Sequence, residues 1–358
     1  MDRLRPARPE LAGLVPYSDK EVTAQVMLAS NENPADLPPE IAKKLGRVVR
    51  SGCAFNRYPD PMASELRGLI AEANGLEPGN VLVGNGGDEL IFDLLLAWGG
   101  PGRTLLDMPP TFVMYGLDAQ VTGTNVTAMP RTAGFDVDDA AVLDRLGRGD
   151  VDLVFVANPN NPTGNVAAET LLIDILNSTD ALVLVDEAYF EFSRQTMRPH
   201  MSRHPNLVIL RTFSKAFCLA GMRVGYLLAS DEVVRELTKV RQPYSVGRFS
   251  QQVASLVFSE RAAFESGIRA IVRQRDAIYR ALGEMPRVEA FPSEANFVLF
   301  RVDDAHEVWR SLLDDHSVLV RDFSRTPLLG DCLRVTIGTD AENRRFLDAL
   351  ADILGRRA

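Results

Sequence analysis

From about residue 81, short apolar runs alternate with longer amphipathic stretches. Most runs are apolar throughout rather than at every second position, which is typical of strands covered by helices on both faces. Six such runs occur, at 81–84, 104–107, 151–157, 181–186, 206–212 and 224–229. This alternation predicts a doubly wound α/β domain built on a mostly parallel sheet.

The two ends of the chain have other patterns. The first 40 residues are rich in proline and polar residues, which favours an arm over a core element. Regular apolar positions predict a long helix over roughly 250–283, followed by strands over 295–302, 317–323 and 332–339 and a helix over 341–354. We expect an N-terminal arm with part of a small domain (1–45), a large domain (46–250), and a linking helix with a C-terminal small α+β domain (251–358).

Composition narrows the class of protein. The chain has 358 residues, of which 46% are hydrophobic and 24% charged, as in ordinary globular proteins. Its formal net charge of −9 argues against a nucleic-acid or anionic-membrane binder. Three widely spaced cysteines indicate neither a disulfide framework nor a metal site. With no signal-peptide pattern and no membrane-spanning run, we expect a cytoplasmic protein.

The stretch GNGGDE, residues 84–89, follows the first apolar run. Its glycines at 84, 86 and 87 allow a tight turn, and Asp88 and Glu89 open an amphipathic helix. The free N–H groups at such a helix start suit a phosphate, which makes the Gly87–Asp88 turn a candidate cradle. The dinucleotide fingerprint G-x-G-x-x-G fits poorly, because Glu89 occupies the third position. A plain glycine turn is the alternative interpretation.

Polar residues also stand at or just beyond the ends of the third and fourth runs. Asn161 lies in NPNNPTG, where the following proline holds an amide with one donor and one acceptor group at a strand end. Asp186 ends ALVLVD, and a carboxylate at the end of a buried strand needs a partner. An N-cap is the structural alternative for Asp186.

Lys215 lies in RTFSKAF, among Phe213, Ala216 and Phe217. Desolvation lowers the pKa of a lysine, and a neutral lysine can form a Schiff base with a carbonyl. Ser214 and Arg223 lie close by in the sequence and can hold a dianionic phosphate.

These residues together fit pyridoxal phosphate. That cofactor needs a lysine for its aldehyde, an acid at its pyridine nitrogen, a donor to its ring oxygen, a phosphate cradle and a stacking ring. The sequence offers each of them near a strand end: Lys215, Asp186, Asn161, the Gly87–Asp88 turn with Ser214 and Arg223, and Tyr115.

On these motifs the chain resembles the fold-type I aminotransferases, and within them the histidinol-phosphate aminotransferase family. The likeness covers nearly the whole chain, in the order VPY, SNENP, RYPDP, GNGGDE, PPTFVMYG, NPNNPTG, VDEAYFEF, RTFSKAF, GMRVGY, VRDF and CLRVTIGT. The resemblance implies a pyridoxal-phosphate enzyme with a large domain and a smaller α+β domain.

The resemblance also implies residue roles around the cofactor. Lys215 would bind the aldehyde and move a proton between the substrate Cα and C4′, and Asp186 would keep the pyridine nitrogen protonated. Asn161 and Tyr189 would bond the ring oxygen, and Tyr115 would stack on the ring. Gly87, Asp88, Ser214 and Arg223 would hold the phosphate, together with Tyr58 of the other subunit of a homodimer.

For the substrate, the resemblance implies that Arg334 binds the carboxylate of the amino-acid or oxo-acid partner. Arg321 would join Arg334 in holding the phosphate of histidinol phosphate, with Tyr17, Asn33 and Tyr244 as further contacts. A strand-end ion pair is the structural alternative for the two arginines. No metal is implied.

The expected reaction is transamination of L-histidinol phosphate with 2-oxoglutarate, giving imidazole acetol phosphate and glutamate in histidine biosynthesis. Three alternatives remain open: an aromatic amino-acid aminotransferase, a threonine-phosphate decarboxylase, and more remotely a nicotinamide-dependent oxidoreductase. A non-catalytic regulator of this fold is least expected, because no room for a DNA-binding domain precedes residue 30. The segments after VPY and SNENP depart from the family pattern, which bears on the substrate and leaves the cofactor chemistry unchanged.

Overall fold

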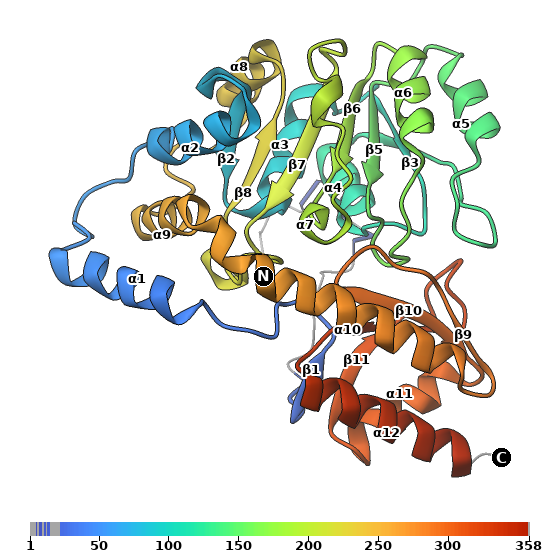
Figure 1. Cartoon of the computed structure of the whole chain (residues 1–358). Helices are drawn as coiled ribbons and strands as arrows, with labels where there is room; N and C mark the ends of the chain where they lie inside the picture. The colour runs from blue at the N-terminus through green and yellow to red at the C-terminus, as the bar shows by residue number, and fades with distance from the viewer. Residues whose placement is uncertain (1–4, 6, 9–10, 12, 15–21, 357–358) are drawn as a thin grey trace.

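The computed structural model describes residues 5, 7–8, 11, 13–14 and 22–356, and it has two domains. The large domain, at the top of Figure 1, is built on a seven-stranded sheet in the order β2-β8-β7-β6-β5-β3-β4. Strands β3 to β7 pair in parallel, whereas β8 is antiparallel to both β7 and β2. The strands are β2 (Val81–Gly84), β3 (Thr104–Asp107), β4 (Asn125–Ala128), β5 (Leu153–Ala157), β6 (Leu182–Asp186), β7 (Leu207–Thr212) and β8 (Gly225–Leu228).

Helices cover both faces of this sheet, as the continuous apolar runs predicted. Alternate residues of each strand enter two cores: in β6, Val183 and Val185 face one core and Leu182 and Leu184 the other. The first core lies under α2 (Ser64–Asn74), α5 (Asp139–Leu146), α6 (Glu169–Asn177), α7 (Phe190–Ser193) and α9 (Arg248–Ser259). The second lies under α3 (Gly86–Trp98), α4 (Met114–Thr122) and α8 (Asp231–Val240).

The small domain, at the lower right of Figure 1, carries a five-stranded sheet in the order β1-β11-β12-β10-β9. Its elements are β1 (Val26–Leu28), β9 (Val288–Ala290), β10 (Phe297–Val302), β11 (Val318–Asp322), β12 (Cys332–Thr336), α11 (Ala305–Asp314) and α12 (Asp340–Arg356). The N-terminal segment is therefore more than an arm, because β1 pairs in parallel with β11 and buries Val26 and Leu28. The boundaries at 45 and 250 stay a prediction.

The predicted long helix over 250–283 is wrong in one respect. The segment forms two helices, α9 and α10 (Glu265–Gly283), separated by a 3-10 turn at Arg261–Phe264. Phe264 at this turn is buried and meets Phe217 edge-on, which anchors the break against the loop that carries Lys215. In Figure 1, α10 then crosses from the large domain onto the small one, while α1 (Pro39–Ser51) projects away from both.

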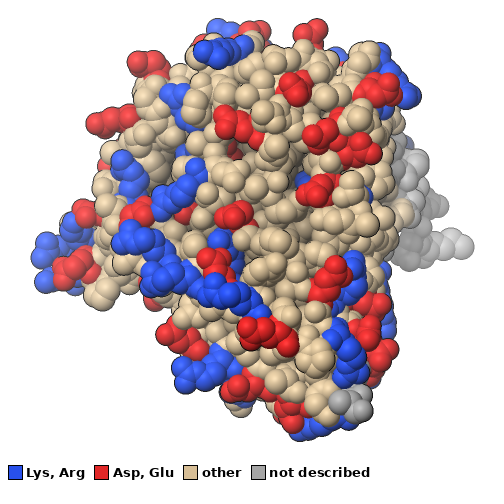
Figure 2. All heavy atoms as spheres, turned by 45° about the vertical axis from the view of Figure 1, so that its right-hand side comes forward, with Lys and Arg blue, Asp and Glu red and all other residues tan. Residues whose placement is uncertain are grey.

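Charged side chains of both signs lie on the surface of the protein. Figure 2 shows a band of Lys and Arg side chains across one face, flanked by Asp and Glu side chains. Within the described residues, no helix has both the length and the apolar character needed to cross a membrane.

Candidate active site

A cavity of about 490 Å³ lies where the carboxyl ends of β5, β6 and β7 meet β11 and β12 of the small domain. It brings together ten residues predicted from the sequence: Gly87, Asp88, Asn161, Asp186, Tyr189, Ser214, Lys215, Arg223, Arg321 and Arg334. Parallel strands end at one edge of a sheet, which explains why residues far apart in sequence converge there. The remote alternative of a nicotinamide-dependent oxidoreductase gains no support from this arrangement, because the GNGGDE turn lines the same cavity as Lys215 and Asp186.

Lys215 is positioned by the turn that follows β7. Its Nζ donates to the carbonyl oxygen of Ser30 at 3.1 Å. Burial, and next the positive charge of Arg334, together lower the pKa of Lys215 to about 8. A lysine with this pKa presents an appreciable fraction of neutral, nucleophilic amine near neutral pH.

Asp186 ends β6 in the cavity wall, where each of its carboxylate oxygens accepts one hydrogen bond. The hydroxyl of Tyr115 donates to Oδ2 at 2.6 Å, and the N–H of Ala188 donates to Oδ1 at 3.0 Å. Burial raises the pKa of Asp186 to about 6, and these two hydrogen bonds oppose the rise. The carboxyl is thus held in one orientation and is mostly ionised at pH 7, which suits a cationic ring nitrogen.

The predicted stacking role of Tyr115 is not supported by its position. Tyr115 is fully buried and does not line the cavity, whereas Phe112 does. The reason is local: α4 begins at Met114, and its inward face carries Tyr115 and, one turn later, Ala119 into the core of the large domain. Phe112 precedes the helix and lines the cavity, so its ring, unlike that of Tyr115, is available for stacking.

One end of the cavity forms an anion cradle. It comprises the first turn of α3 at Gly87 and Asp88, the hydroxyls of Thr212 and Ser214, and the guanidinium of Arg223. First-turn N–H groups of a helix have no acceptor within the helix, so they can bind an anion. Thr212, which the sequence did not single out, donates to Ser214 Oγ at 3.0 Å. Arg223 also pairs with Asp88 at 2.9 Å, so an anion would share this guanidinium with a carboxylate.

Two glycines keep this end of the cavity open. Gly86 has φ +84°, and a Cβ there would lie 2.5 Å from Nη2 of Arg223. A Cβ on Gly225 would lie 2.9 Å from the backbone of Gly86 and Gly87. Side chains at either position would displace the backbone turn or the arginine, so the cradle depends on their absence.

The small-domain wall of the cavity carries two arginines from neighbouring strands. Arg321 of β11 and Arg334 of β12 are register partners. Nη1 of Arg334 donates to Oδ1 of Asn161, which leaves the Nδ2 group of Asn161 to donate to a ligand oxygen. Nη2 of Arg334 donates to the carbonyl oxygen of Ala29 at 2.7 Å. The pair can therefore receive a second anion, a carboxylate or a phosphate, at a distance from the first cradle.

Tyr189 lines the cavity beside Asp186, and burial raises the pKa of its hydroxyl to about 12. Nδ2 of Asn31 donates to that hydroxyl at 2.8 Å. Asn31 was missed by sequence reasoning, although it stands in SNENP two residues before the predicted Asn33. Asn33 instead donates to the carbonyl oxygens of Lys215 and Ala216 and does not line the cavity. It fixes the lysine turn rather than facing the predicted substrate position.

Two other predicted residues do not line the cavity. Tyr58 is 77% exposed and Tyr244 is 44% exposed, and their rings stack on each other with centroids 4.9 Å apart. Within a single chain neither reaches the cavity, so the assignment of Tyr58 to a partner's site stays a prediction. Tyr17 lies outside the described residues. Glu32, also unnoticed in SNENP, lines the cavity near Lys215.

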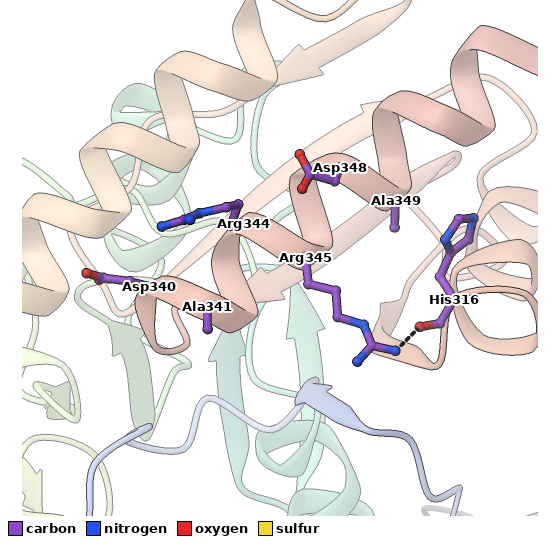
Figure 3. Close-up of a pocket in the computed structure, with 7 residues that line it drawn as sticks. All are labelled: His316, Asp340, Ala341, Arg344, Arg345, Asp348 and Ala349. Carbon is purple, nitrogen blue, oxygen red and sulfur yellow. Dashed lines mark hydrogen bonds between the residues drawn. The ribbon is translucent and has the colours of Figure 1, made fainter.

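A separate cavity of about 580 Å³ lies on the small domain along α12 (Figure 3). Six of its seven lining residues come from that helix, and the seventh is His316. Figure 3 shows Arg345 reaching the carbonyl oxygen of His316, while Asp340, Arg344 and Asp348 point away from the imidazole ring. Its polar groups do not converge on one point, unlike those around Lys215. The described residues also hold no group of three or more His, Cys, Asp or Glu side chains suited to a metal ion.

Comparison with known proteins identifies relatives over the full length of the chain. A histidinol-phosphate aminotransferase of Caldanaerobacter subterraneus subsp. tengcongensis is 36% identical over 347 residues, covering 97% of this chain and 98% of the relative. Histidinol-phosphate aminotransferase 1 of Carboxydothermus hydrogenoformans is 39% identical over 355 residues, covering 99% of this chain and 100% of the relative. The histidinol-phosphate aminotransferase of Thermococcus kodakarensis is 39% identical, covering 96% and 97%.

Solved structures agree on the fold. The histidinol-phosphate aminotransferase of Sinorhizobium meliloti, in complex with pyridoxal-5′-phosphate, superposes with a TM-score of 0.90 over 99% of both chains, at 23% identity. L-threonine-O-3-phosphate decarboxylase of Porphyromonas gingivalis superposes with a TM-score of 0.81 over 92% of this chain and 99% of that chain, at 26% identity. The sequence profile of the family "Aminotransferase class I and II" matches residues 23–350. The chain therefore belongs to the class I and II aminotransferases, with the fold-type I architecture and with near full-length relatives named histidinol-phosphate aminotransferase.

Proposed function

We propose that this protein is a pyridoxal-phosphate-dependent histidinol-phosphate aminotransferase. It would transfer the amino group of L-histidinol phosphate to 2-oxoglutarate, giving imidazole acetol phosphate and glutamate. The observation that carries the proposal is a single cavity that holds Lys215 together with two candidate anion sites, the cradle at Gly87, Ser214 and Arg223 and the pair Arg321 and Arg334. The first suits the phosphate of the cofactor, and the second suits the phosphate or carboxylate of the substrate.

The residues present fit the cofactor. When bound, pyridoxal phosphate supplies an aldehyde that condenses with amines and a ring that accepts an electron pair. Asp186 supplies the fixed carboxylate for the ring nitrogen, Asn161 a donor for the ring oxygen, and Phe112 an apolar face for the ring. Tyr189 stands beside them as a second group for the ring oxygen.

Lys215 is the group proposed to move the proton. Its lowered pKa gives Nζ a neutral form that would accept the proton from the substrate Cα and deliver it to C4′, the carbon derived from the cofactor aldehyde. Arg321 and Arg334 would hold the far end of the amine or the oxo acid, so that the Cα–H bond is presented to Nζ. The same two guanidiniums would serve both half-reactions, because an arginine fork binds carboxylate and phosphate in similar geometry.

The test is the visible absorption spectrum of the purified protein with pyridoxal phosphate, before and after L-histidinol phosphate. Loss of the band of the lysine-bound cofactor with histidinol phosphate, and its return with 2-oxoglutarate, supports the proposal. A band that responds instead to an aromatic amino acid, or that accompanies release of CO₂ from phosphothreonine, moves the assignment to another member of the superfamily. No band at all would rule out the cofactor.

We also propose a homodimer in which Tyr58 reaches the cofactor phosphate of the partner. Support comes from the exposed aromatic side chains Phe55, Tyr58 and Tyr244, which a partner subunit would cover. Co-expression of Lys215→Ala with Tyr58→Phe distinguishes shared from separate sites. In mixed dimers, shared sites restore one intact site, so activity should exceed that of either variant alone. Activity no higher than that of the two variants combined would contradict the shared site.

We place the enzyme in the cytoplasm. Its three cysteines, Cys53, Cys218 and Cys332, are all unpaired, which suits a reducing compartment. Fractionation of cells that produce the protein would test this location.

A further inference from the structure

Tyr115 stands directly behind Asp186, on the side away from the cavity. Its side chain is fully buried, and its hydroxyl donates to Asp186 Oδ2 at 2.6 Å. The N–H of Ala188 holds the other oxygen at 3.0 Å. We propose that Tyr115 is a positioning residue that keeps Asp186 oriented and ionised for the protonated ring nitrogen of the cofactor. This inference rests on the proposed function.

The surroundings of Tyr115 allow its hydroxyl little freedom. Its ring meets Phe112 with centroids 5.5 Å apart at 84° and Phe155 at 5.3 Å and 75°. Ala119, one turn further along α4, is buried in the same core. Because the ring is held by packing on several sides, the short hydrogen bond to Asp186 is set by the fold before any ligand binds.

The charges around Asp186 explain why a donor is needed. Asp88 and Glu187 both face it with negative charge, and burial adds a desolvation cost, so all three favour a protonated carboxyl. The hydrogen bond from Tyr115 is the largest opposing contribution, followed by that from the N–H of Ala188. Without the phenol, Asp186 should carry a proton over more of the neutral range, and a neutral acid cannot hold a cationic nitrogen.

A purely structural role for Tyr115 makes a different prediction. If Tyr115 only fills the core, its loss should weaken the binding of any ligand of the same shape. If it acts through Asp186, the loss should depend on whether the ligand ring contains the nitrogen that Asp186 contacts. A cofactor analogue with CH in place of this nitrogen separates the two cases.

The experiment measures the affinity of the refolded or cofactor-stripped protein for pyridoxal phosphate and for its 1-deaza analogue, in wild type and Tyr115→Phe. Wild type should prefer pyridoxal phosphate. Tyr115→Phe should lose about tenfold in affinity for pyridoxal phosphate, the low end for a hydrogen bond to a charged group, and much less for the analogue. In an Asp186→Asn background, Tyr115→Phe should cause no further selective loss.

Tyr226→Phe is the matched control, because Tyr226 is also buried and its hydroxyl bonds Arg211 rather than Asp186. It should leave the preference for pyridoxal phosphate unchanged. Equal losses for both ligands in Tyr115→Phe, or no loss for either, would overturn the inference, and so would a wild type without preference. Wild-type protein that binds neither ligand would instead count against the proposed function. Thermal unfolding of each variant without ligand shows whether Tyr115→Phe is folded. The comparison of Tyr115→Phe with and without Asp186→Asn gives a second test, because both proteins lack the same phenol and differ only in the carboxyl group of Asp186.

Discussion

The amine of Lys215 should lose its proton at a pH where an exposed lysine stays charged. Burial, and then the charge of Arg334, lower its pKa from the usual 10.5 to about 8. One pKa unit is a factor of ten in the ratio of neutral to charged amine, so at pH 7 the free amine should be about 300-fold more abundant at Lys215 than at an ordinary lysine. This is the property that a lysine needs in order to attack an aldehyde near neutral pH.

The assay is brief labelling of the cofactor-free protein with limiting acetic anhydride between about pH 6 and 11, followed by peptide mass spectrometry. Labelling of Lys215 should reach half its maximum near pH 8. Lys239 on α8 provides the reference in the same sample, because its amine is exposed and pairs with Glu236 on its own helix. Arg334→Gln should shift the midpoint of Lys215 to higher pH, since it removes a positive charge that disfavours the ammonium form.

Two results would refute this reasoning. If Lys215 and Lys239 show the same pH dependence, then Lys215 is solvated in solution and its burial in the cavity is wrong. If the labelling of Lys215 has a low midpoint pH but Arg334→Gln does not change it, then burial alone lowers the pKa of Lys215. Lys215 and Arg334 are then not electrostatically coupled. The cofactor must be fully removed beforehand, because the bound form blocks the amine.

Three further predictions concern other parts of the site. Arg211→Met should destabilise the fold by about 3–5 kcal/mol in urea unfolding at pH 7, because it strands the buried Glu187 carboxylate that Arg211 contacts at 2.9 Å. Without Arg211 the pKa of Glu187 should rise further, so the stability lost in Arg211→Met should shrink as the pH falls toward 5 and Glu187 becomes protonated. The control Arg148→Met, which breaks an exposed ion pair, should cost less than about 1 kcal/mol. A stability loss in Arg211→Met that does not change with pH would contradict the account. Arg321→Gln should raise KM for L-histidinol phosphate by about 10–100-fold and affect KM for 2-oxoglutarate less; steady-state kinetics showing equal effects would argue against a phosphate contact. Asn161→Ala should shift the visible band of the bound cofactor and lower kcat, and an unchanged spectrum would exclude its bond to the ring oxygen.

Continuous apolar runs made the large sheet predictable. Strands β5, β6 and β7 are buried on both faces, so most of their residues are apolar. Their polar residues, Asp186, Arg211 and Thr212, stand at the carboxyl ends and mark the edge of the sheet. The short edge strands β4 and β9 were not predicted. Their residues are mostly exposed or half-buried, so burial imposes no apolar pattern on them.

The choice between Tyr115 and Phe112 shows where sequence reasoning stops. Both aromatic residues stand in PPTFVMYG after β3, and either ring could stack on a cofactor. The outcome depends on the residue at which α4 begins and on which of its faces meets the sheet. Helix boundaries are weakly encoded by local sequence, since packing against the rest of the domain decides them.

The sequence by itself determined the kind of chemistry, because an amine, an acid and an amide each follow a recognisable strand in a recognisable order. Only the tertiary structure decided how the N-terminal segment takes part. Ala29 holds Arg334, Ser30 accepts from Lys215 and Asn31 donates to Tyr189, across separations of 158 to 305 residues. No local pattern specifies such contacts, because they form only when β1 joins the small-domain sheet and brings this segment between the two domains.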